Sequence, residues 1–437
     1  MLPVLTAAES SRLDAASSIA MTDLMRRAGV AAAHQAVVRY GIRYGSRVVV
    51  LAGPGNNGGD AYVVATALAR RGAAVSIVPF GSPQSEAAVH HGRRAGTISR
   101  IVPEEVDLIV DGLFGAGSRP GVPEQFRHWG EAPAPILSLD LPSGLDADTG
   151  EAGEGTFRAD CTVAFHSLKP GHVLGDGPDH CGDVVVADIG LEGGDPSFLV
   201  VEASDAPRPS RLRRAHKWSA GSVLVVGGSR GMIGAAVMAA RSALRFGAGA
   251  VGIATPDPGT AQLLAPEILA FSMDDLPGGF DTWVVGPGLA NGHEELVAHA
   301  HDRAGPTVID AGALRPVAPG SGHEDIVLTP HEGERRRMGD ISQSHVTVLR
   351  KGNPTVIEGE VPWIVNSGGP ELATIGTGDV LAGMVGALLA RGSTGPEAAR
   401  SAAYWHGVAG AWLQSEQGFV TADALADAVG RFAWSTP

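Results

Sequence analysis

The sequence predicts two consecutive α/β domains, each built on a parallel sheet with crossover helices. A chain of 437 residues is too long for one ordinary hydrophobic core. In both halves, short apolar runs end in glycine-rich or polar turns, and stretches with helical spacing follow them. Between the halves, residues 202–219 carry two prolines and five Lys or Arg residues, a composition typical of a solvated linker. We therefore expect domains at 1–205 and 206–437.

The individual elements follow from apolar periodicity. In the first half we expect strands at 48–51, 75–80, 108–111 and 135–140, and helices at 60–71 and at 9–40 with a break near Gly29. In the second half we expect strands at 222–226, 251–255, 283–285, 307–310 and 346–349, and helices at 234–246, 379–390 and 396–414. The two halves show no common order of motifs, so the pattern does not indicate a duplication.

Composition excludes several classes of function. A formal net charge of -14 argues against broad nucleic-acid binding, which needs clustered cations. The N-terminal segment lacks the basic-then-apolar order of a signal peptide, and Arg241 and Arg245 interrupt the longest apolar stretch, so we expect no membrane segment. The two cysteines, Cys161 and Cys181, have no metal-type spacing and are expected to be free thiols. These features predict a cytoplasmic protein.

A glycine-rich segment, Gly53-Pro54-Gly55-Asn56-Asn57-Gly58-Gly59-Asp60, follows the first buried strand. Backbone N–H groups and a helix start at such a turn can hold phosphate. Its glycines match G-x-G-x-x-G, but the ribose-binding carboxylate about twenty residues later is missing, and so is the Lys-Ser/Thr of a P-loop. The asparagines and the aspartate favour a ligand that needs amide and carboxylate contacts as well.

Two further polar segments follow strands of the same sheet. They run from Asp111 to Ser118 and from Asp140 to Gly144. Either one alone is explained by a tight turn with a capping aspartate. Three at successive strand ends favour a ligand site, because ligands of open α/β sheets bind at the carboxyl ends of the strands.

Together with Thr162–Phe165 and Lys169–Gly171, these motifs resemble the NAD(P)H-hydrate epimerase domain over roughly the first 195 residues. The resemblance implies a Rossmann-like three-layer fold, epimerisation of R and S NADH-hydrate or NADPH-hydrate, and a bound K⁺. It implies acid–base catalysis by Asp140 first and Asp60 second, and a K⁺ site formed by Asn57, Asp111 and Ser143. The implied substrate contacts are Asn56, Asn57, Gly58, Gly59, Gly115, Ala116, Gly117, Ser118, Arg119, Pro120 and Gly121.

The second half carries the glycine-aspartate motif Gly376-Thr377-Gly378-Asp379 before a predicted helix. Amides at a helix start stabilise a transferring phosphoryl group, and the aspartate can take a proton from the attacking hydroxyl. An ordinary N-capping aspartate is the alternative for any single such motif. The segments 286–288, 329–334 and 351–355 also follow strands. A lone His331 would more often be structural, but its crowded titratable neighbours favour a substrate contact.

With Ala215–Ser219 and Gly227–Ser229, these motifs resemble the ribokinase-like ADP/ATP-dependent NAD(P)H-hydrate dehydratase over about 210–437. The resemblance implies phosphorylation of the hydrate hydroxyl and loss of phosphate, with Mg²⁺, Asp379 as base, and ADP rather than ATP from the bacterial-type fused arrangement. The implied hydrate contacts are Ala235, Gly288 and His331, and the implied nucleotide contacts are Lys351, Gly352, Asn353, Pro354, Thr355 and Gly378. The segment Asp310–Leu314 has only the first of the two aspartates in the family's usual pattern, and this difference bears on how Mg²⁺ is placed.

The sequence is thus interpreted as a bifunctional repair enzyme for hydrated nicotinamide cofactors, in which the epimerase supplies the one epimer that the dehydratase accepts. Two alternatives stay open at this point: a ribokinase-like kinase of a vitamin precursor or sugar, and a first domain that only binds its ligand. The expected partners are the small-molecule substrates, with no nucleic acid and no membrane. Family resemblance also suggests a homo-oligomer.

Overall fold

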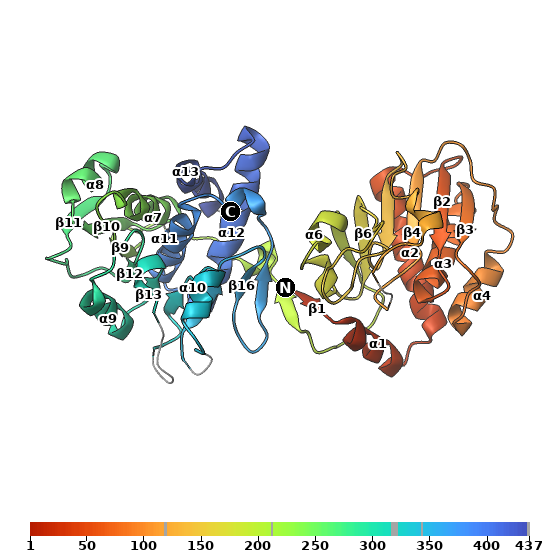
Figure 1. Cartoon of the computed structure of the whole chain (residues 1–437), viewed down its shortest axis with the longest axis horizontal. Coiled ribbons are helices and arrows are strands. Elements are labelled where there is room, and N and C mark those ends of the chain that lie inside the picture. Colours follow the sequence, from red (N-terminus) through yellow and green to blue (C-terminus); the bar gives the residue numbers. More distant parts are fainter. Residues whose placement is uncertain (118–119, 211–212, 316–321, 342–343, 435–437) are drawn as a thin grey trace. The chain divides into compact units, whose positions relative to one another are not determined.

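The computed structural model describes residues 1–117, 120–210, 213–315, 322–341 and 344–434. The chain divides into an N-terminal unit, Leu2–Phe198, and a C-terminal unit, Leu199–Pro437 with Met1. Both are mixed α/β structures (Figure 1), as predicted. The separate folding of 1–205 and 206–437 stays a prediction.

The N-terminal unit is built on an all-parallel sheet in the order β3-β2-β4-β5-β6-β7. Its strands are β2 (Arg47–Ala52), β3 (Ala74–Pro79), β4 (Leu108–Gly112), β5 (Ile136–Leu139), β6 (Cys161–Phe165) and β7 (Asp183–Ala187). The chain leaves β2 for β3 on one side and then returns to β4 on the other side. The carboxyl ends of β2 and β4 are therefore a topological switch point, where open α/β sheets bind ligands.

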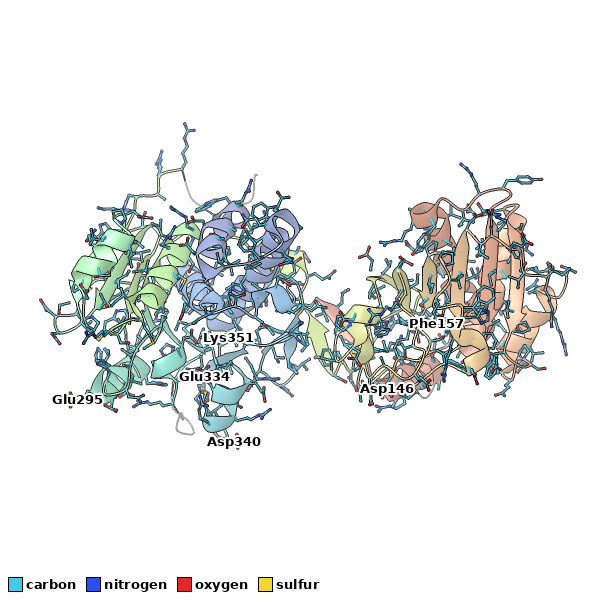
Figure 2. All side chains as sticks on the ribbon, turned by 45° about the horizontal axis from the view of Figure 1, so that its top comes forward. Asp146, Phe157, Glu295, Glu334, Asp340 and Lys351 are labelled. Atoms are coloured by element: carbon cyan, nitrogen blue, oxygen red, sulfur yellow. The ribbon has the colours of Figure 1, made fainter. Side chains whose placement is uncertain are left out.

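Helices cover the sheet of this unit unequally (Figure 1). Helices α2 (Met21–Tyr40), α3 (Asn56–Arg70) and α4 (Glu86–Arg94) pack together and cover the face that presents Val48 and Val50. The other face presents Val49 and Leu51 to Phe126, in the short helix α5 (Glu124–Arg127), and to the fully buried Phe157, which Figure 2 labels. The N-terminal segment adds β1 (Leu2–Val4) and α1 (Ala7–Ala16), and α6 (Gly177–His180) lies between β6 and β7.

The C-terminal unit contains a sheet in the order β8-β17-β16-β15-β14-β13-β12-β9-β10-β11. The strands from β15 to β11 run parallel, and β16 is antiparallel to both of its neighbours. Their bounds are β8 (Phe198–Val200), β9 (Ser222–Val226), β10 (Ala250–Thr255), β11 (Leu269–Ser272), β12 (Thr282–Val285), β13 (Thr307–Ile309), β14 (Ile326–Leu328), β15 (Thr347–Arg350), β16 (Thr355–Ile357) and β17 (Trp363–Val365). The order reverses beside β9, so its carboxyl end and that of β12 form a second switch point.

Two helical layers enclose this sheet (Figure 1). One core gathers Val223 and Val225 with α7 (Ile233–Arg245), α8 (Pro258–Leu264), α11 (Thr377–Leu389), α12 (Gly395–Gln417) and α13 (Ala422–Ala433). The opposite core gathers Leu224 and Val226 with α9 (Glu294–Asp302) and with Met338, which follows α10 (Glu332–Arg337). Among the described residues, none of the helices has both the length and the apolar character needed to cross a bilayer.

Two expectations about helices are wrong. The first helical stretch breaks at residues 17–20, and Gly29 lies inside α2. A Cβ at Gly29 would lie 2.5 Å from Val63 Cβ and 2.8 Å from the Asp60 carbonyl oxygen, so this glycine permits close packing of α2 on α3. Helix α3 also begins at Asn56 rather than Asp60, which turns the second half of the glycine-rich segment into the first helical turn.

Replacing Gly29 by Ala is expected to destabilise the N-terminal unit. Overpacking of this kind costs about 1–3 kcal/mol, more than the roughly 1 kcal/mol that Ala gains over Gly in a helix. Calorimetry that resolves the transition of this unit measures the effect. Gly234→Ala in α7, where an added Cβ would meet no atom within 4 Å, serves as the control and should leave the melting temperature unchanged or raise it. Equal stability of Gly29→Ala and the unaltered protein would contradict the packing argument.

Candidate functional site

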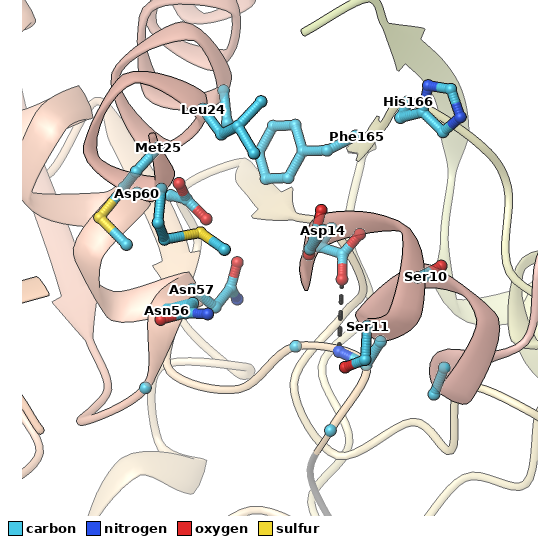
Figure 3. A pocket seen from close by; sticks show the side chains of 18 of the residues that line it. Ser10, Ser11, Asp14, Leu24, Met25, Asn56, Asn57, Asp60, Phe165 and His166 are labelled. Atoms are coloured by element: carbon cyan, nitrogen blue, oxygen red, sulfur yellow. Dashed lines mark hydrogen bonds between the residues drawn. The ribbon is translucent and has the colours of Figure 1, made fainter. Parts of the chain in front are cut away.

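A cavity of about 420 Å³ lies at the switch point of the N-terminal unit. Loops after all six strands of the sheet line it, together with α1, α2 and α3. Figure 3 shows Asn56, Asn57 and Asp60 projecting from α3 on one side, Asp14 from α1 opposite them, and Leu24 and Met25 from α2. An apolar wall and several converging polar groups are what a small-molecule site needs.

Most of the predicted contacts of the first site meet in this cavity. Those that line it are Asn56, Asn57, Asp60, Gly115, Ala116, Gly117 and Asp140. Gly58 and Gly59 do not line it: a Cβ at Gly58 would strike the Gly53 carbonyl oxygen, and one at Gly59 the Met25 sulfur. Gly58 therefore lets the first turn of α3 approach the Gly53 backbone, and Gly59 lets α3 pack on α2. Pro120 and Gly121 also lie outside the lining, and Gly121 donates its N–H to Gly144 O. Ser118 and Arg119 lie outside the described residues.

Asp140 and His166 share an uncommon backbone conformation. Each follows directly on a strand, β5 or β6, and has a positive φ, 61° for Asp140 and 65° for His166. In each case the next residue's N–H bonds the carbonyl of the residue before, Leu141 to Leu139 at 2.7 Å and Ser167 to Phe165 at 2.8 Å. These are γ-turns of the rarer, strained form. Strain at two adjacent strand ends lining one cavity marks a functional position.

The buried ammonium of Lys169 organises the charges of this site. It donates to Asp140 Oδ1 at 2.5 Å and to the Phe165 and Ser167 carbonyls at 3.3 and 3.4 Å. Burial alone would raise the pKa of Asp140, but the charge and hydrogen bond of Lys169 outweigh it and hold that pKa below its ordinary value. The backbone N–H of Ala116 also donates to Asp140. Asp140 is therefore an ionised carboxylate.

The pKa of Asp60 is shifted in the opposite direction. Burial and the negative charges of Asp140 and Asp14 raise the pKa of Asp60 well above its ordinary value, against the opposing charge of Lys169. The pKa of Asp14 is also raised, again chiefly by burial. Burial and these negative charges favour the protonated form of Asp60, whereas Lys169 favours the ionised form of Asp140. Two carboxyl groups of one cavity with pKa values shifted apart are the pattern of an acid–base pair.

His172 holds Lys169 and Asp140 in place from outside the cavity. The Lys169 backbone N–H donates to His172 Nδ1 at 2.8 Å, so the ring proton is on Nε2, which donates to the Asp140 carbonyl at 2.7 Å. Burial and the charge of Lys169 lower the pKa of His172 to about 4. The imidazole is neutral and ties Lys169 to Asp140 through both of its nitrogens.

Hydrogen bonds connect the three residues predicted to hold K⁺, and some of their oxygen atoms already have hydrogen-bond partners within the protein. Asp111 is fully buried and accepts from Ser143 N at 2.8 Å, Ser143 Oγ at 2.5 Å and Ser138 Oγ at 2.9 Å. Ser143 Oγ accepts from Phe114 N–H, and Asn57 Nδ2 donates to Phe114 O. The buried Oδ1 of Asn57 has no hydrogen-bond partner among the described residues. That unsatisfied oxygen, in a set of oxygen donors, fits a bound cation.

In the C-terminal unit, Lys351, Asp310 and Asp379 form a second charged cluster. Lys351 Nζ donates to the buried Asp310 Oδ1 at 2.7 Å. Burial would lower the pKa of Lys351, but Asp310 raises it, with smaller contributions from Glu334, which Figure 2 labels beside it, and Asp379. Burial and the charge of Asp310 raise the pKa of Asp379 to about 7. Asp379 lies in the first turn of α11, at the end of the helix where the amides point outward.

The predicted contacts of the second site fall into two groups. Lys351, Gly352, Asn353, Thr355 and Gly378 line a cavity of about 240 Å³, and Pro354 does not. At the switch point beside β9, a Cβ at Gly288 would lie 3.1 Å from Ala235 Cβ, so those two positions are adjacent.

His331 accepts hydrogen bonds from the Gly333 and Glu334 N–H groups and caps α10. This is the structural role that the sequence analysis considered less favoured than a substrate contact. One carboxylate oxygen of Asp310 accepts a hydrogen bond from Lys351. Within the described residues, no three acidic, histidine or cysteine side chains converge as a metal site.

Sequence reasoning assigned no role to Asp14, Lys169 or His172. Lys169 stood in a motif, but nothing in the pattern placed its ammonium on Asp140, 29 residues away. Both cysteines are free, as expected, and the structure shows that both are buried.

Two α/β units, each with charged groups gathered at the carboxyl ends of parallel strands, define a two-domain enzyme. Residues 21–171 match the family model of the YjeF-related protein N-terminus, and residues 223–431 match that of NAD(P)H-hydrate dehydratase. A bifunctional NAD(P)H-hydrate repair enzyme Nnr of Mycobacterium leprae is 36% identical over 90% of both chains. Its Escherichia coli counterpart is 32% identical over 91% of this chain and 86% of its own. The chain belongs to the family of bifunctional NAD(P)H-hydrate repair enzymes.

One solved structure extends the comparison to the C-terminal unit. It is an ADP/ATP-dependent NAD(P)H-hydrate dehydratase from Bacillus subtilis, co-crystallised with ATP and Mg²⁺. It is 28% identical to this chain, with a TM-score of 0.48, and the match covers 52% of this chain and 94% of that one.

The bridging role of His172 predicts that its ring stays neutral until the pH falls to about 4, well below the ordinary 6.5. NMR titration of the histidine ring signals measures this, and the signal lost in His172→Gln identifies the residue. Protonation of His172 near pH 6.5 in the folded protein would show that Nδ1 is not accepting the Lys169 N–H.

Proposed function

We propose that the N-terminal unit epimerises the R and S forms of NADH-hydrate or NADPH-hydrate, and that the C-terminal unit dehydrates the S form with ADP and Mg²⁺. The observation that carries the first half is that Asp60 and Asp140 line one cavity, that Asp140 is paired with the buried Lys169 ammonium, and that the pKa values of the two carboxyl groups are shifted in opposite directions. Epimerisation at an aminal-type carbon requires the C–O bond to break and re-form on the other face. That reaction needs an acid for the leaving hydroxyl and a base for the returning water.

The acid and the base are assigned from the directions of their pKa shifts. Protonated Asp60 gives its proton to the ring hydroxyl as the C–O bond breaks, which releases water and leaves a cationic ring. Ionised Asp140 then accepts a proton from the water that adds to the opposite face. Lys169 keeps Asp140 ionised in the free enzyme, and the His172 bridge keeps its backbone in place. The roles exchange when the reaction runs from the other epimer.

The remaining contacts of the first site bind the substrate. The amino end of α3, with Asn56 and Asn57, faces the cavity and suits the substrate's phosphates. Asn57 and Ser143 would hold K⁺ beside them, with Asp111 behind, and the ion would supply positive charge toward the phosphates.

In the second site, the proposed base is Asp379. A carboxylate with a pKa of about 7 can accept the proton of the hydrate hydroxyl as it attacks a phosphoryl group. The ammonium of Lys351 lies against Gly378, since a Cβ on that glycine would be 3.1 Å from Nζ, so cation and helix amides face the same phosphate position. Mg²⁺ would share the phosphates, and Asp310 has one carboxylate oxygen left for it. ADP over ATP, a homo-oligomer and a cytoplasmic location stay predictions.

The test is recovery of the dihydronicotinamide absorbance from mixed R and S NADH-hydrate with ADP or ATP and Mg²⁺. The unaltered protein should recover all of the NADH faster than spontaneous epimerisation allows. Asp140→Asn should stop at the S fraction, because loss of a general base slows epimerisation by about a hundredfold or more. Asp379→Asn should recover none, and Asp23→Asn, on the surface of α2, should behave as the unaltered protein. No nucleotide-dependent recovery by the unaltered protein would refute the proposal.

The pKa of Asp379 predicts the pH dependence of the dehydratase. Because a base must be unprotonated, kcat/KM should rise with pH through about 7 and then level off. Asp310→Asn removes a negative charge that raises this pKa, so the rising limb should move to lower pH. Glu295→Gln, an exposed carboxylate of α9, is the matched control and should leave the limb in place. An Asp310→Asn profile that coincides with the control would contradict the assignment.

A further inference from the structure

Helix α1 forms one wall of the first cavity although it lies outside the residues matched by the family model. That model begins at residue 21, whereas Ala7, Ser10, Ser11, Leu13 and Asp14 of α1 all line the cavity. None of the residues of α1 is fully buried, so the helix contributes a wall rather than a core. Neither catalysis nor phosphate binding as assigned above uses it.

The placement of α1 is nevertheless fixed at its start. Leu5 N–H donates to Leu168 O at 3.0 Å, and Leu168 N–H donates to Pro3 O at 3.1 Å. Thr6 and Glu9 form a capping box, and Asp148 accepts the Ala7 N–H at 2.8 Å. Because Leu168 stands between Ser167 and Lys169, these bonds hold α1 against the loop that carries the ammonium. Asp14 accordingly interacts with the charges of Lys169, Asp140 and His166.

A second polar group at this end of the cavity also has no assigned role. Ser167 lines the cavity with 1% of its surface exposed, and its Oγ has no hydrogen-bond partner among the described residues. A buried hydroxyl without a partner is costly, and such groups are normally satisfied by a ligand or water. The hydroxyl of Ser167 can donate one hydrogen bond to a ligand, and the Asp14 carboxylate can accept hydrogen bonds from one.

We infer that Asp14 and Ser167 bind the carboxamide of the substrate's nicotinamide ring, with Asp14 accepting from its NH₂ group and Ser167 donating to its carbonyl. This inference rests on the proposed epimerase function. The hydrated ring has two hydrogen-bond donors, the hydroxyl at the epimerising carbon and the carboxamide NH₂. Asp60 and Asp140 serve the first. Asp14 lies at the same end of the cavity, so the carboxamide is the donor that remains for it. Asp14 is a positioning residue, which sets the face of the ring that meets Asp60 and Asp140.

The experiment compares two substrates in epimerisation: NADH-hydrate and the hydrate of the reduced 3-acetylpyridine analogue, in which a methyl group replaces the NH₂. Asp14→Ala should raise KM for NADH-hydrate by about ten- to a hundredfold, the loss expected for a hydrogen bond to a charged group. It should change KM for the analogue by less than about threefold, because that substrate has no N–H to lose. Asp14→Asn, whose amide oxygen still accepts, should recover part of the affinity. A merely structural role of Asp14 would affect both substrates equally.

Asp23→Ala is the matched control, an exposed aspartate of α2 that lies outside the cavity. It should leave KM unchanged for both substrates. Dehydration of S NADH-hydrate by the same full-length variants reports whether the rest of the chain is intact. If the unaltered protein epimerises and Asp14→Ala shows the same KM for NADH-hydrate, or an equal loss with both substrates, the inference is overturned and the proposed function stands. If the unaltered protein does not epimerise, the proposed function fails first and the inference fails with it.

Discussion

The chemistry of the first site depends on one buried ammonium group. Lys169 is 3% exposed and holds Asp140 at 2.5 Å, yet three carboxylates of the cavity compete for its charge. Removing such charges from water is costly unless they are paired and hydrogen-bonded, and the Phe165 and Ser167 carbonyls complete the coordination of Nζ. Because Lys169 pairs with Asp140, the pKa of that carboxyl is lowered, whereas burial and the neighbouring negative charges raise the pKa of Asp60. The two pKa values are thus shifted apart before any substrate binds.

The second site also places a lysine–aspartate pair near a further carboxyl group, but different backbone elements carry these residues. Lys351 pairs with the buried Asp310, and the same Asp310 raises the pKa of Asp379 to about 7. In both units, therefore, a lysine–aspartate pair lies near a further carboxyl group whose pKa is raised. The difference lies in the setting. Asp140 comes from a strained γ-turn after a strand, whereas Asp379 lies in the first turn of a helix, whose amides face the phosphate position.

Much of this arrangement could be predicted from the sequence, because glycine-rich turns after apolar strands mark the carboxyl edge of a parallel sheet. The strands at 48–51 and 222–226 and the segments at Asp111 and Asp140 lie where they were expected. Gly29 was misread because a glycine looks the same in sequence whether it ends a helix or permits close packing. The bond from Lys169 to Asp140 and the approach of α1 could not be predicted, because both depend on tertiary contacts between segments that sequence periodicity does not connect. The crowded neighbours of His331 suggested substrate binding; the structure shows that it caps α10, and the substrate contact stays a prediction.

The strained turns at Asp140 and His166 connect these observations. A positive φ costs an aspartate or a histidine of the order of 1–3 kcal/mol and persists only where the surroundings over-determine it. Here the surroundings are identifiable. His172 bonds the Asp140 carbonyl, Lys169 bonds its carboxylate, and the strand β1 pairs with Leu168 directly after the second turn. The same bonds that hold the strained backbone also place Asp14 and Ser167 at the reacting end of the cavity. In this unit the proposed acid–base pair and the wall that we infer to orient the ring are therefore fixed by one network, and loosening either is expected to disturb the other.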